Sequence, residues 1–279
     1  MKSSIVLSVL ASVTLAQAAQ AAPERVKVPG SAVTLAAILY KPEGNGPFPA
    51  VVALHGCNGL FTRDGQTAPR EAAWAEKLVQ EGFVVLLPDS FGPRGLGPQC
   101  RTRERRARAS VERREDAHAA RRWLQEQAFV KPSAVSLMGW SNGGTATLYA
   151  IRQERQARPG RGFRVVGTDF AAAVAFYPGC LALNERPYRT RVTTTILSGE
   201  LDDWTPVKPC EALAARAKSA GSPLSITVYP GAHHDFDWPD RPVTVVRGLL
   251  LAGRGEAHAG TNPAARADAL RKVPTLLAR

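Results

Sequence analysis

The chain alternates short apolar runs with longer segments whose apolar positions recur every three or four residues. The short runs are typical of β-strands, and the longer segments are typical of amphipathic helices. We predict strands near residues 33–40, 49–54, 83–87, 134–139, 171–177, 192–198 and 225–229. We predict helices near residues 69–81, 109–127, 143–154, 207–220 and 263–277.

This alternation predicts an α/β fold. Strands that alternate with helices form right-handed crossovers, which place helices on both faces of a mostly parallel, doubly wound sheet. The run at 49–54 is almost continuously apolar, as expected for a parallel strand that is buried on both faces. No repeat or linker divides the chain after residue 21, so we expect a single domain over residues 22–279.

The first 21 residues have the pattern of a secretory signal peptide. Lys2 precedes an apolar core at residues 5–15, and two A-x-A cleavage sites follow, at residues 16–18 and 19–21. The apolar core is too short to span a bilayer, and no other segment approaches the required length of about 20 apolar residues. We therefore expect a signal peptide at 1–21, no membrane span, and a protein that is periplasmic or secreted.

A G-x-S-x-G motif joins the strand near 134–139 to the helix that follows it. Its residues are Gly139-Trp140-Ser141-Asn142-Gly143. In such a turn the glycines relieve crowding where strand and helix meet, and the serine hydroxyl is left at the edge of the sheet. Ser141 is therefore the candidate nucleophile.

A serine nucleophile needs a base, and the base needs an acid that orients it. Asp202 lies in a loop just after the strand near 192–198, and His233 and His234 follow the strand near 225–229. Taken singly, each could be an ordinary turn or loop residue. Together with Ser141 they stand at strand ends in the chain order Ser, Asp, His, which is the α/β-hydrolase arrangement.

The chain resembles the dienelactone hydrolase family, a branch of the α/β-hydrolases. The likeness is carried by LHGCNG at 54–59, PDSFGPRG at 88–95, GWSNGG at 139–144, GELDDW at 199–204 and YPGAHHDF at 229–236. The family's G-x-x-D pattern implies that Asp202 rather than Asp203 is the acid. Its histidine lies two residues before a phenylalanine, which implies His234 rather than His233.

The resemblance also implies an oxyanion hole and a substrate pocket. Backbone amides of Cys57 and Asn142 would bind the negative charge that develops on the substrate oxygen, although residues 55–59 could also be a plain glycine turn. The family proper has a cysteine where this chain has Ser141, which favours a serine esterase. One family arginine that holds the dienelactone carboxylate falls near a tryptophan here. Candidate substrate contacts are Arg94, as the remaining anion-binding residue, and Trp140, Trp204 and Trp238.

Four cysteines in an exported chain suggest disulfides, and four allow three pairings. Because Cys57 and Cys100 lie in loops after neighbouring strands, as do Cys180 and Cys210, we favour those two pairs. Cys57 as a nucleophile is disfavoured because it lacks a strand-to-helix turn. No cysteines have C-x-x-C spacing, so we predict no metal site.

The formal net charge of +12 is concentrated in a segment with nine arginines between residues 101 and 122. Acidic residues interleave with the arginines and no aromatic platform accompanies them, which disfavours nucleic-acid binding. We interpret the segment, with His118, as a solvated helix face, and weak attraction to anionic substrates or an anionic envelope surface stays open. His258 is expected in a loop.

Taken together, the sequence predicts a serine hydrolase that cleaves a small-molecule carboxylic ester or lactone through an acyl-enzyme. No cofactor is implied, because the three residues supply the chemistry. Two alternatives stay open. One is a serine peptidase of the same fold, and the other is an inactive hydrolase homologue that binds the cell envelope.

Overall fold

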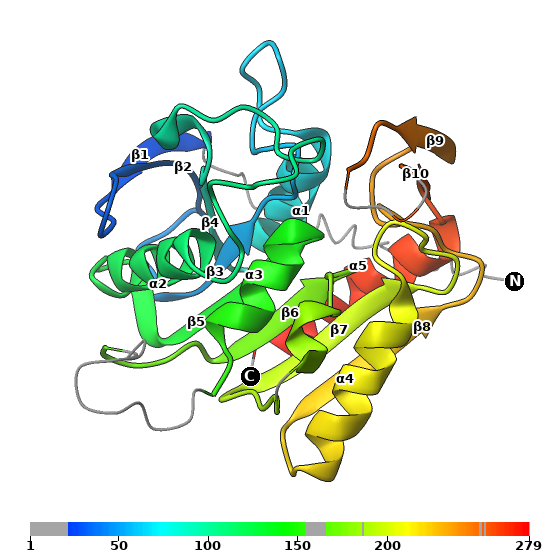
Figure 1. Ribbon diagram of the computed structural model, residues 1–279. Helices are drawn as coiled ribbons and strands as arrows, with labels where there is room; N and C mark the ends of the chain where they lie inside the picture. Colours follow the sequence, from blue (N-terminus) through cyan, green and yellow to red (C-terminus); the bar gives the residue numbers. More distant parts are fainter. Residues whose placement is uncertain (1–21, 154–165, 186, 251–252, 254, 279) are drawn as a thin grey trace, which may run out of the picture.

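The computed structural model describes residues 22–153, 166–185, 187–250, 253 and 255–278. Its centre is an eight-stranded sheet with the order β1-β2-β4-β3-β5-β6-β7-β8 (Figure 1). β2 is antiparallel to both of its neighbours, and β3 to β8 run parallel. The strands are β1 Glu24–Val28, β2 Leu35–Tyr40, β3 Phe48–Leu54, β4 Val84–Pro88, β5 Val130–Trp140, β6 Ala172–Phe176, β7 Thr193–Gly199 and β8 Leu224–Tyr229.

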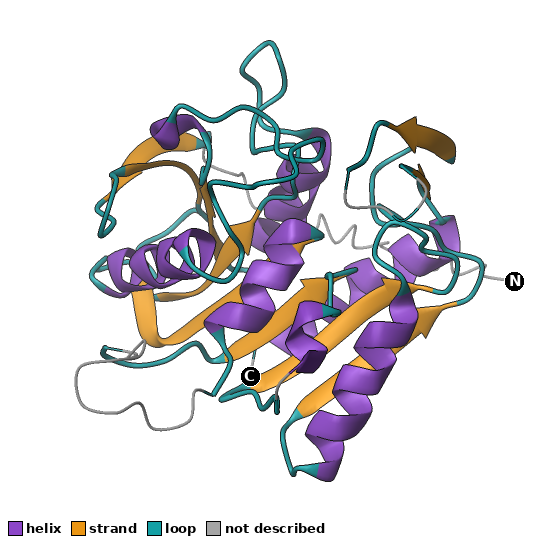
Figure 2. Ribbon diagram, in the orientation of Figure 1, coloured by secondary structure: helices purple, strands orange, loops and turns teal. Residues whose placement is uncertain are grey.

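Helices cover both faces of this sheet (Figure 2). α1 and α5 share one apolar cluster, in which Trp74 and Val273 are buried. α2, α3 and α4 cover the opposite face, where Ala117, Ala146 and Leu213 are buried in two further clusters. The predicted doubly wound, mostly parallel sheet is therefore confirmed. The helices are α1 Pro69–Gln80, α2 Glu112–Gln125, α3 Asn142–Ala150, α4 Val207–Ser219 and α5 Pro263–Leu277.

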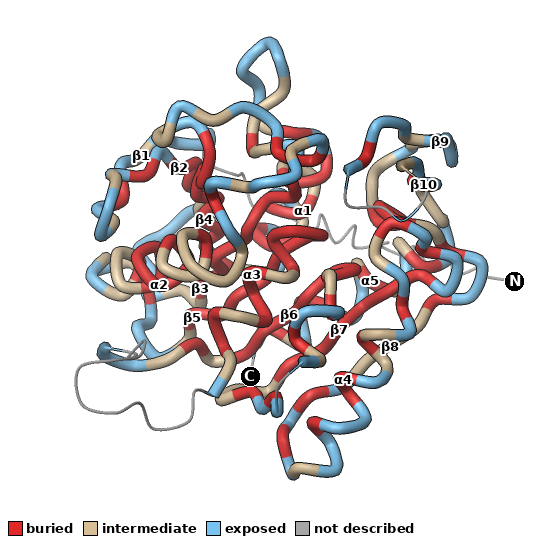
Figure 3. The backbone as a smooth tube through the Cα atoms, viewed as in Figure 1, coloured by how far each residue is buried: buried red, intermediate tan, exposed pale blue. Residues whose placement is uncertain are grey.

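All seven predicted strands and five predicted helices have a counterpart, but three strands were not predicted. These are β1 and a separate two-stranded antiparallel sheet, β9 Thr244–Arg247 with β10 Glu256–Ala259. β1 buries only Val28, and β9 has no buried residue, so neither has a strong apolar signal. Figure 3 shows this contrast between the exposed β9 and the buried central strands. The predicted signal peptide lies outside the described residues. Among the described residues, no helix is long and apolar enough to cross a bilayer.

The turn from β5 into α3 has an unusual backbone. Ser141 has φ 52° and ψ −114°, values that a residue with a side chain rarely adopts. A Cβ atom at Gly143 would lie 2.1 Å from the carbonyl oxygen of Leu54, and one at Gly139 would lie 2.5 Å from that of Gly143. Glycine is required at both positions because the backbones of β3, β5 and α3 touch there.

The parallel strands bring the candidate residues to one edge. The carboxyl ends of β3 to β8 all point the same way, and ligands of doubly wound sheets bind outside these ends. Ser141 directly follows β5, Asp202 follows β7, and His234 follows β8. The topology therefore gathers the predicted nucleophile, acid and base at the carboxyl edge of the sheet.

We predict that Gly143→Ala destabilises the protein by at least about 3 kcal/mol, because the new methyl group can only fit if β3 and α3 move apart. The free energy of unfolding in urea measures this effect. Gly97→Ala is the matched control, since a Cβ at Gly97 meets nothing within 4 Å. Equal stability of the two variants would contradict the close packing of the turn.

Candidate active site

Ser141 is held at the start of α3 by its backbone. Its N–H donates to the carbonyl oxygen of Phe176 on β6 at 2.9 Å, and its own carbonyl accepts the N–H of Thr145 at 2.8 Å. Ser141 is 7% exposed. Ser141 is therefore fixed at the sheet edge by backbone hydrogen bonds to β6 and to α3.

Asp202 and His234 are in direct contact. Oδ2 of Asp202 lies 2.8 Å from Nδ1 of His234, and both residues are buried. Oδ1 of Asp202 accepts the backbone N–H groups of Trp204 at 3.0 Å and Thr205 at 2.8 Å. An ionised carboxylate only accepts, so the His234 proton resides on Nδ1 and the lone pair of the neutral ring on Nε2. This is the tautomer that a general base requires.

The surroundings of His234 favour its protonated form. Burial alone would lower the pKa of the imidazole, but the charge and hydrogen bond of Asp202 outweigh it, and the pKa lies above its usual value. Two aromatic rings are close to the imidazole, with centroid distances of 4.5 Å to Tyr177 and 4.7 Å to Trp204. Aromatic faces also attract a cation. The site is thus suited to hold an imidazolium that forms during a reaction.

The loops that carry Asp202 and His234 are bonded to each other. The N–H of Leu201 donates to the carbonyl of Ala232 at 2.9 Å, and that of Glu200 donates to Tyr229 at 3.0 Å. A Cβ at Gly199 would lie 2.3 Å from the carbonyl oxygen of Ala232. The two loops are therefore packed backbone against backbone, which fixes the spacing of the acid and the base.

A buried arginine connects the loop after β3 to the start of α3. Arg113 of α2 is fully buried and donates from Nη1 to Oδ1 of Asn142 at 2.6 Å and from Nη2 to the carbonyl of His55 at 2.6 Å. These two segments carry the amides of Cys57 and Asn142 that the family resemblance assigns to an oxyanion hole. Arg113 therefore bonds the two segments to each other.

His55 stiffens the same loop as a neutral ring. Burial, reinforced by the nearby charge of Arg113, lowers the pKa of His55 well below its usual value. The neutral ring bonds on both sides, because Nδ1 lies 2.7 Å from the carbonyl of Gly56 and Nε2 accepts the N–H of Ser90 at 3.1 Å. The loop after β3 is thereby bonded to the loop after β4.

Both favoured cysteine pairs are bonded. Cys57 is joined to Cys100 and Cys180 is joined to Cys210. The first disulfide ties the loop after β3 to the chain 43 residues further on. It packs with Trp204 and with Ala257 of β10 in one small apolar cluster, so it supports the rim of the site.

A buried charge network lies behind the site and was not predicted from the sequence. Arg70 of α1 is 4% exposed and donates from Nη1 to Oδ1 of Asp235 at 2.8 Å and to the Tyr177 hydroxyl at 3.1 Å. Arg241 donates to the other oxygen of Asp235 at 2.9 Å. Since Asp235 adjoins His234, the two arginines anchor the loop that carries His234. A basic residue in the first turn of a helix is unfavourable for the helix dipole. The position of Arg70 in the first turn of α1 was therefore the one signal in the sequence that this arginine has a special role.

Asp237 is the second buried acid of this network. Its Oδ2 accepts the indole N–H groups of Trp74 at 2.7 Å and Trp140 at 2.8 Å, and its Oδ1 accepts the Tyr177 hydroxyl at 2.5 Å. Trp140 is therefore a core residue with no exposed surface. Our prediction that Trp140 contacts substrate was wrong, because its ring points into the sheet–helix interface and its polar atom is already bonded.

The structure also contradicts a free anion-binding role for Arg94. Nη1 and Nη2 of Arg94 form a bidentate ion pair with Asp116 at 2.9 and 2.7 Å, and Nη1 also donates to the carbonyl of Ser90. Trp204 packs on His234, as described above. Trp238 is partly exposed, and the guanidinium carbon of Arg70 lies 5.0 Å from its ring centroid. Substrate contact by Trp204 and Trp238 stays a prediction.

The arginine-rich segment is not only a solvated face. Arg113 and Arg121 have no exposed surface, and His118 is 1% exposed. Nε2 of His118 lies 2.9 Å from the carbonyl oxygen of Ala150, and burial lowers its pKa to about 3. Our expectation of a solvated His118 was therefore wrong. The hydrophobic pattern of the sequence did not indicate the burial of His118, because α2 packs against α3 through a face that is rich in charged residues.

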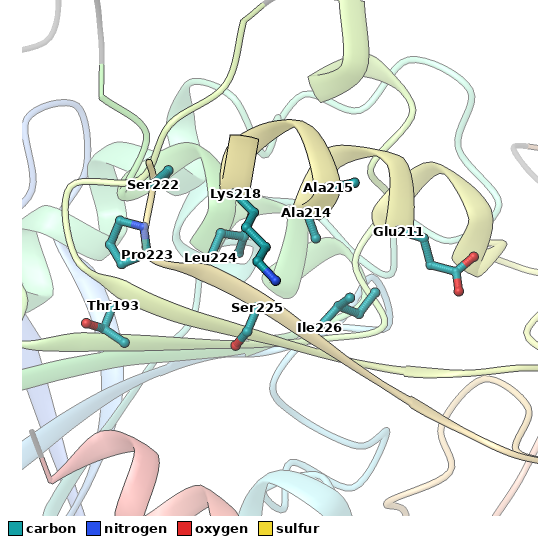
Figure 4. Close-up of a pocket in the computed structure, with 10 residues that line it drawn as sticks. All are labelled: Thr193, Glu211, Ala214, Ala215, Lys218, Ser222, Pro223, Leu224, Ser225 and Ile226. Atoms are coloured by element: carbon teal, nitrogen blue, oxygen red, sulfur yellow. The ribbon is translucent and has the colours of Figure 1, made fainter. Parts of the chain in front are cut away.

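A separate groove lies between α4 and the edge strand β8 (Figure 4). Its volume is about 680 Å³. None of the predicted catalytic or substrate-binding residues lines it. Its lining residues are Thr193, Glu211, Ala214, Ala215, Lys218, Ser222, Pro223, Leu224, Ser225 and Ile226.

The strand order, the strained serine turn and the acid–histidine pair at the carboxyl edge define an α/β-hydrolase. The chain belongs to the dienelactone hydrolase family, whose profile matches residues 35–279. The family resemblance predicted from the sequence is thus confirmed, and the chain is a member of a hydrolase family.

Solved structures share this fold at low sequence identity. A candidate dienelactone hydrolase from Klebsiella pneumoniae has a TM-score of 0.68 at 17% identity, with 92% of this chain and 98% of that chain covered. The dienelactone hydrolase-like promiscuous phosphotriesterase P91, from metagenomic libraries, has a TM-score of 0.65 at 18% identity, with 92% and 97% covered. Esterase 2 of Thermogutta terrifontis, phosphorylated by paraoxon, has a TM-score of 0.60 at 17% identity, with 90% and 91% covered.

We predict that Arg113→Met lowers kcat/KM for p-nitrophenyl acetate about 10- to 100-fold, because the loop after β3 and the start of α3 lose their common anchor. The free energy of unfolding should fall by about 2 kcal/mol or less, since the substitution also removes a costly buried charge. Arg122→Met, on the same helix and partly exposed, is the control. Loss of stability without loss of activity would contradict the positioning role.

Proposed function

We propose that the protein is a serine hydrolase that cleaves carboxylic esters or lactones, with Ser141 as nucleophile, His234 as base and Asp202 as the acid that orients His234. The observation that carries the proposal is the buried 2.8 Å contact between Oδ2 of Asp202 and Nδ1 of His234, in the loops that follow β7 and β8; Ser141 directly follows β5 at the same edge of the sheet. Serine nucleophiles require such a base because the free hydroxyl is a weak nucleophile at neutral pH.

The proposed reaction has two halves. Oγ of Ser141 attacks the carbonyl carbon of the substrate while Nε2 of His234 takes the hydroxyl proton, and the imidazolium returns that proton to the leaving alcohol. Water then attacks the acyl-enzyme, again with His234 as base, and releases the carboxylic acid. Asp202 remains ionised throughout and stabilises the imidazolium.

Two backbone amides are proposed to bind the oxyanion, one from Cys57 and one from Asn142. Asn142 is the first residue of α3, where N–H groups have no partner within the helix and the helix dipole is positive. The bonds of Arg113 to Asn142 and to the loop after β3 support this assignment, since a preorganised oxyanion hole needs donors at a fixed separation.

The substrate is proposed to be an ester or lactone without a carboxylate at the position that dienelactone occupies in the family. Arg94 is paired with Asp116, and by the family resemblance one arginine of the family would fall near Trp238, which is not basic. Both changes remove positive charge that would otherwise be free to bind a carboxylate. The T. terrifontis esterase, which paraoxon phosphorylates, has a similar fold. By analogy of fold, it supports an ester as the substrate.

We propose export as the setting for this activity. Residues 1–21 match a signal peptide, and two disulfides are typical of proteins from oxidising compartments.

Two alternative functions remain to be separated from the proposal. A peptidase would use the same three residues, and an inactive homologue would retain the fold alone. Parallel assays with chromogenic esters and peptides separate these alternatives from the proposal.

We predict that a fluorophosphonate probe adds one label to the wild-type protein and none to Ser141→Ala, because only an activated serine attacks phosphorus at a useful rate. Intact mass spectrometry measures the label. Ser136→Ala, on the same strand β5, should be labelled like the wild type. Equal labelling of Ser141→Ala would remove Ser141 as the nucleophile.

We predict that kcat/KM rises with pH as His234 loses its proton, with a midpoint above 6.5, because Asp202 raises the pKa of the imidazole. In Asp202→Asn the midpoint should move to lower pH and kcat should fall, since the charge that raises the pKa is gone. A pH–rate profile of both proteins measures this. An unshifted midpoint in Asp202→Asn would contradict the pairing.

A further inference from the structure

Three side chains that the proposed chemistry does not use meet at the surface. They are Asp203, next to the proposed acid; His233, next to the proposed base; and His258 on β10. One potential ligand atom of each lies within 4.8 Å of the others. The sequence placed His258 in a loop, but β10 pairs with β9 and its Ala259 bridges to His234. This bridge brings His258 to the cluster, and β10 lies near the carboxyl ends of β7 and β8 (Figure 1).

Hydrogen bonds fix both histidine rings in the tautomer that a metal requires. Nδ1 of His233 lies 3.0 Å from the carbonyl oxygen of Leu201, which can only accept. Nδ1 of His258 lies 2.8 Å from Oδ2 of Asp203, and the backbone N–H of His258 donates to Oδ1 at 2.8 Å. When neutral, both rings therefore carry the proton on Nδ1 and the lone pair on Nε2. Ligating histidines almost always have such a carbonyl or carboxylate partner on the other nitrogen.

We propose that Asp203, His233 and His258 form a binding site for a divalent transition metal, with Zn²⁺ as the best fit. Two imidazoles and one carboxylate match the ligands of zinc sites that keep a fourth position for water. Imidazole ligands disfavour Mg²⁺ and Ca²⁺, which bind oxygen. A carboxylate has about four lone-pair sites, so Asp203 can ligate while it accepts from His258.

The cluster can contract to the geometry of a bound metal. Ligand atoms at about 2.0–2.1 Å from Zn²⁺ lie closer together than the 4.8 Å limit of the cluster. The side chains of His258 and Asp203 are 47% and 46% exposed, so small rotations can close the gap without disturbing the core. The two rings are 5.3 Å apart between centroids and inclined by 34°, so the two imidazoles are close neighbours.

The bound metal would join three segments: the loop after β7, the loop after β8, and β10. Asp203 and His233 each adjoin a residue of the proposed catalytic machinery. The metal takes no part in the proposed ester hydrolysis, and its role is to stabilise the arrangement of these segments. The site does not depend on the proposed function, because none of its ligands is Ser141, Asp202 or His234.

Titration of the metal-free, untagged full chain with ZnCl₂ tests the proposal. Calorimetry should show one Zn²⁺ per chain with a dissociation constant in the micromolar range. The midpoint of thermal unfolding should rise by about 5–10 °C when free Zn²⁺ is about 100 times the dissociation constant. CoCl₂ should give the visible absorption of a four-coordinate site. The other three histidines, His55, His118 and His234, are at most 1% exposed, so surface binding cannot be attributed to them.

Variants locate the ligands. His233→Ala, His258→Ala and Asp203→Asn should each weaken Zn²⁺ binding at least about tenfold, and the double variant His233→Ala/His258→Ala should show neither the thermal shift nor the cobalt spectrum. Glu256→Gln, an exposed acid on the same strand, is the control and should bind as the wild type does. Thermal unfolding of each variant in the absence of metal shows whether that variant is folded. Equal binding by the double variant, or no wild-type binding at millimolar Zn²⁺, would overturn the proposal.

Discussion

The close approach of three backbones at the turn after β5 is the constraint on which the rest of the site depends. β3, β5 and α3 come so near each other that Gly139 and Gly143 admit no side chain, and Ser141 is held at a positive φ. This geometry places the first turn of α3 against the backbone of Leu54 and His55. The proposed nucleophile and the proposed oxyanion donors therefore depend on one packing contact.

Buried arginines extend this constraint to the loops. Arg113 bonds the loop after β3 to Asn142, and Arg70 with Arg241 anchors Asp235 beside His234. Burying guanidinium groups is costly unless every charge is paired and hydrogen-bonded. Arg70 and Arg241 are bonded to the carboxylate of Asp235, and Arg113 is bonded to the side-chain carbonyl of Asn142 and the backbone carbonyl of His55. These bonds therefore hold in place the loops around the candidate site, which have little regular structure of their own.

The sequence predicted the residues whose position follows from local pattern. Ser141, Asp202 and His234 could be placed at one edge of the sheet because each follows a strand, and parallel strands end at one edge. The strands β1, β9 and β10 bury few side chains and left no clear pattern. The bonds of Arg70 to Asp235, of Arg94 to Asp116 and of Arg113 to Asn142 could not be predicted, because these partners lie between 22 and 165 residues away along the chain. Judged only from their neighbours in the sequence, such arginines resemble residues of a solvated helix face. Trp140 likewise resembles a pocket residue, although the fold buries it.

The proposed function depends on the formation of an acyl-enzyme at Ser141 with His234 as base. Rapid acid quench of the protein with p-nitrophenyl acetate, followed by peptide mass spectrometry, tests this step directly. We expect one acetyl group per chain, on the peptide that contains Ser141, formed together with a burst of p-nitrophenol and absent from Ser141→Ala. Steady turnover without a covalent acetyl group, or acetylation at another residue in step with the burst, would contradict it.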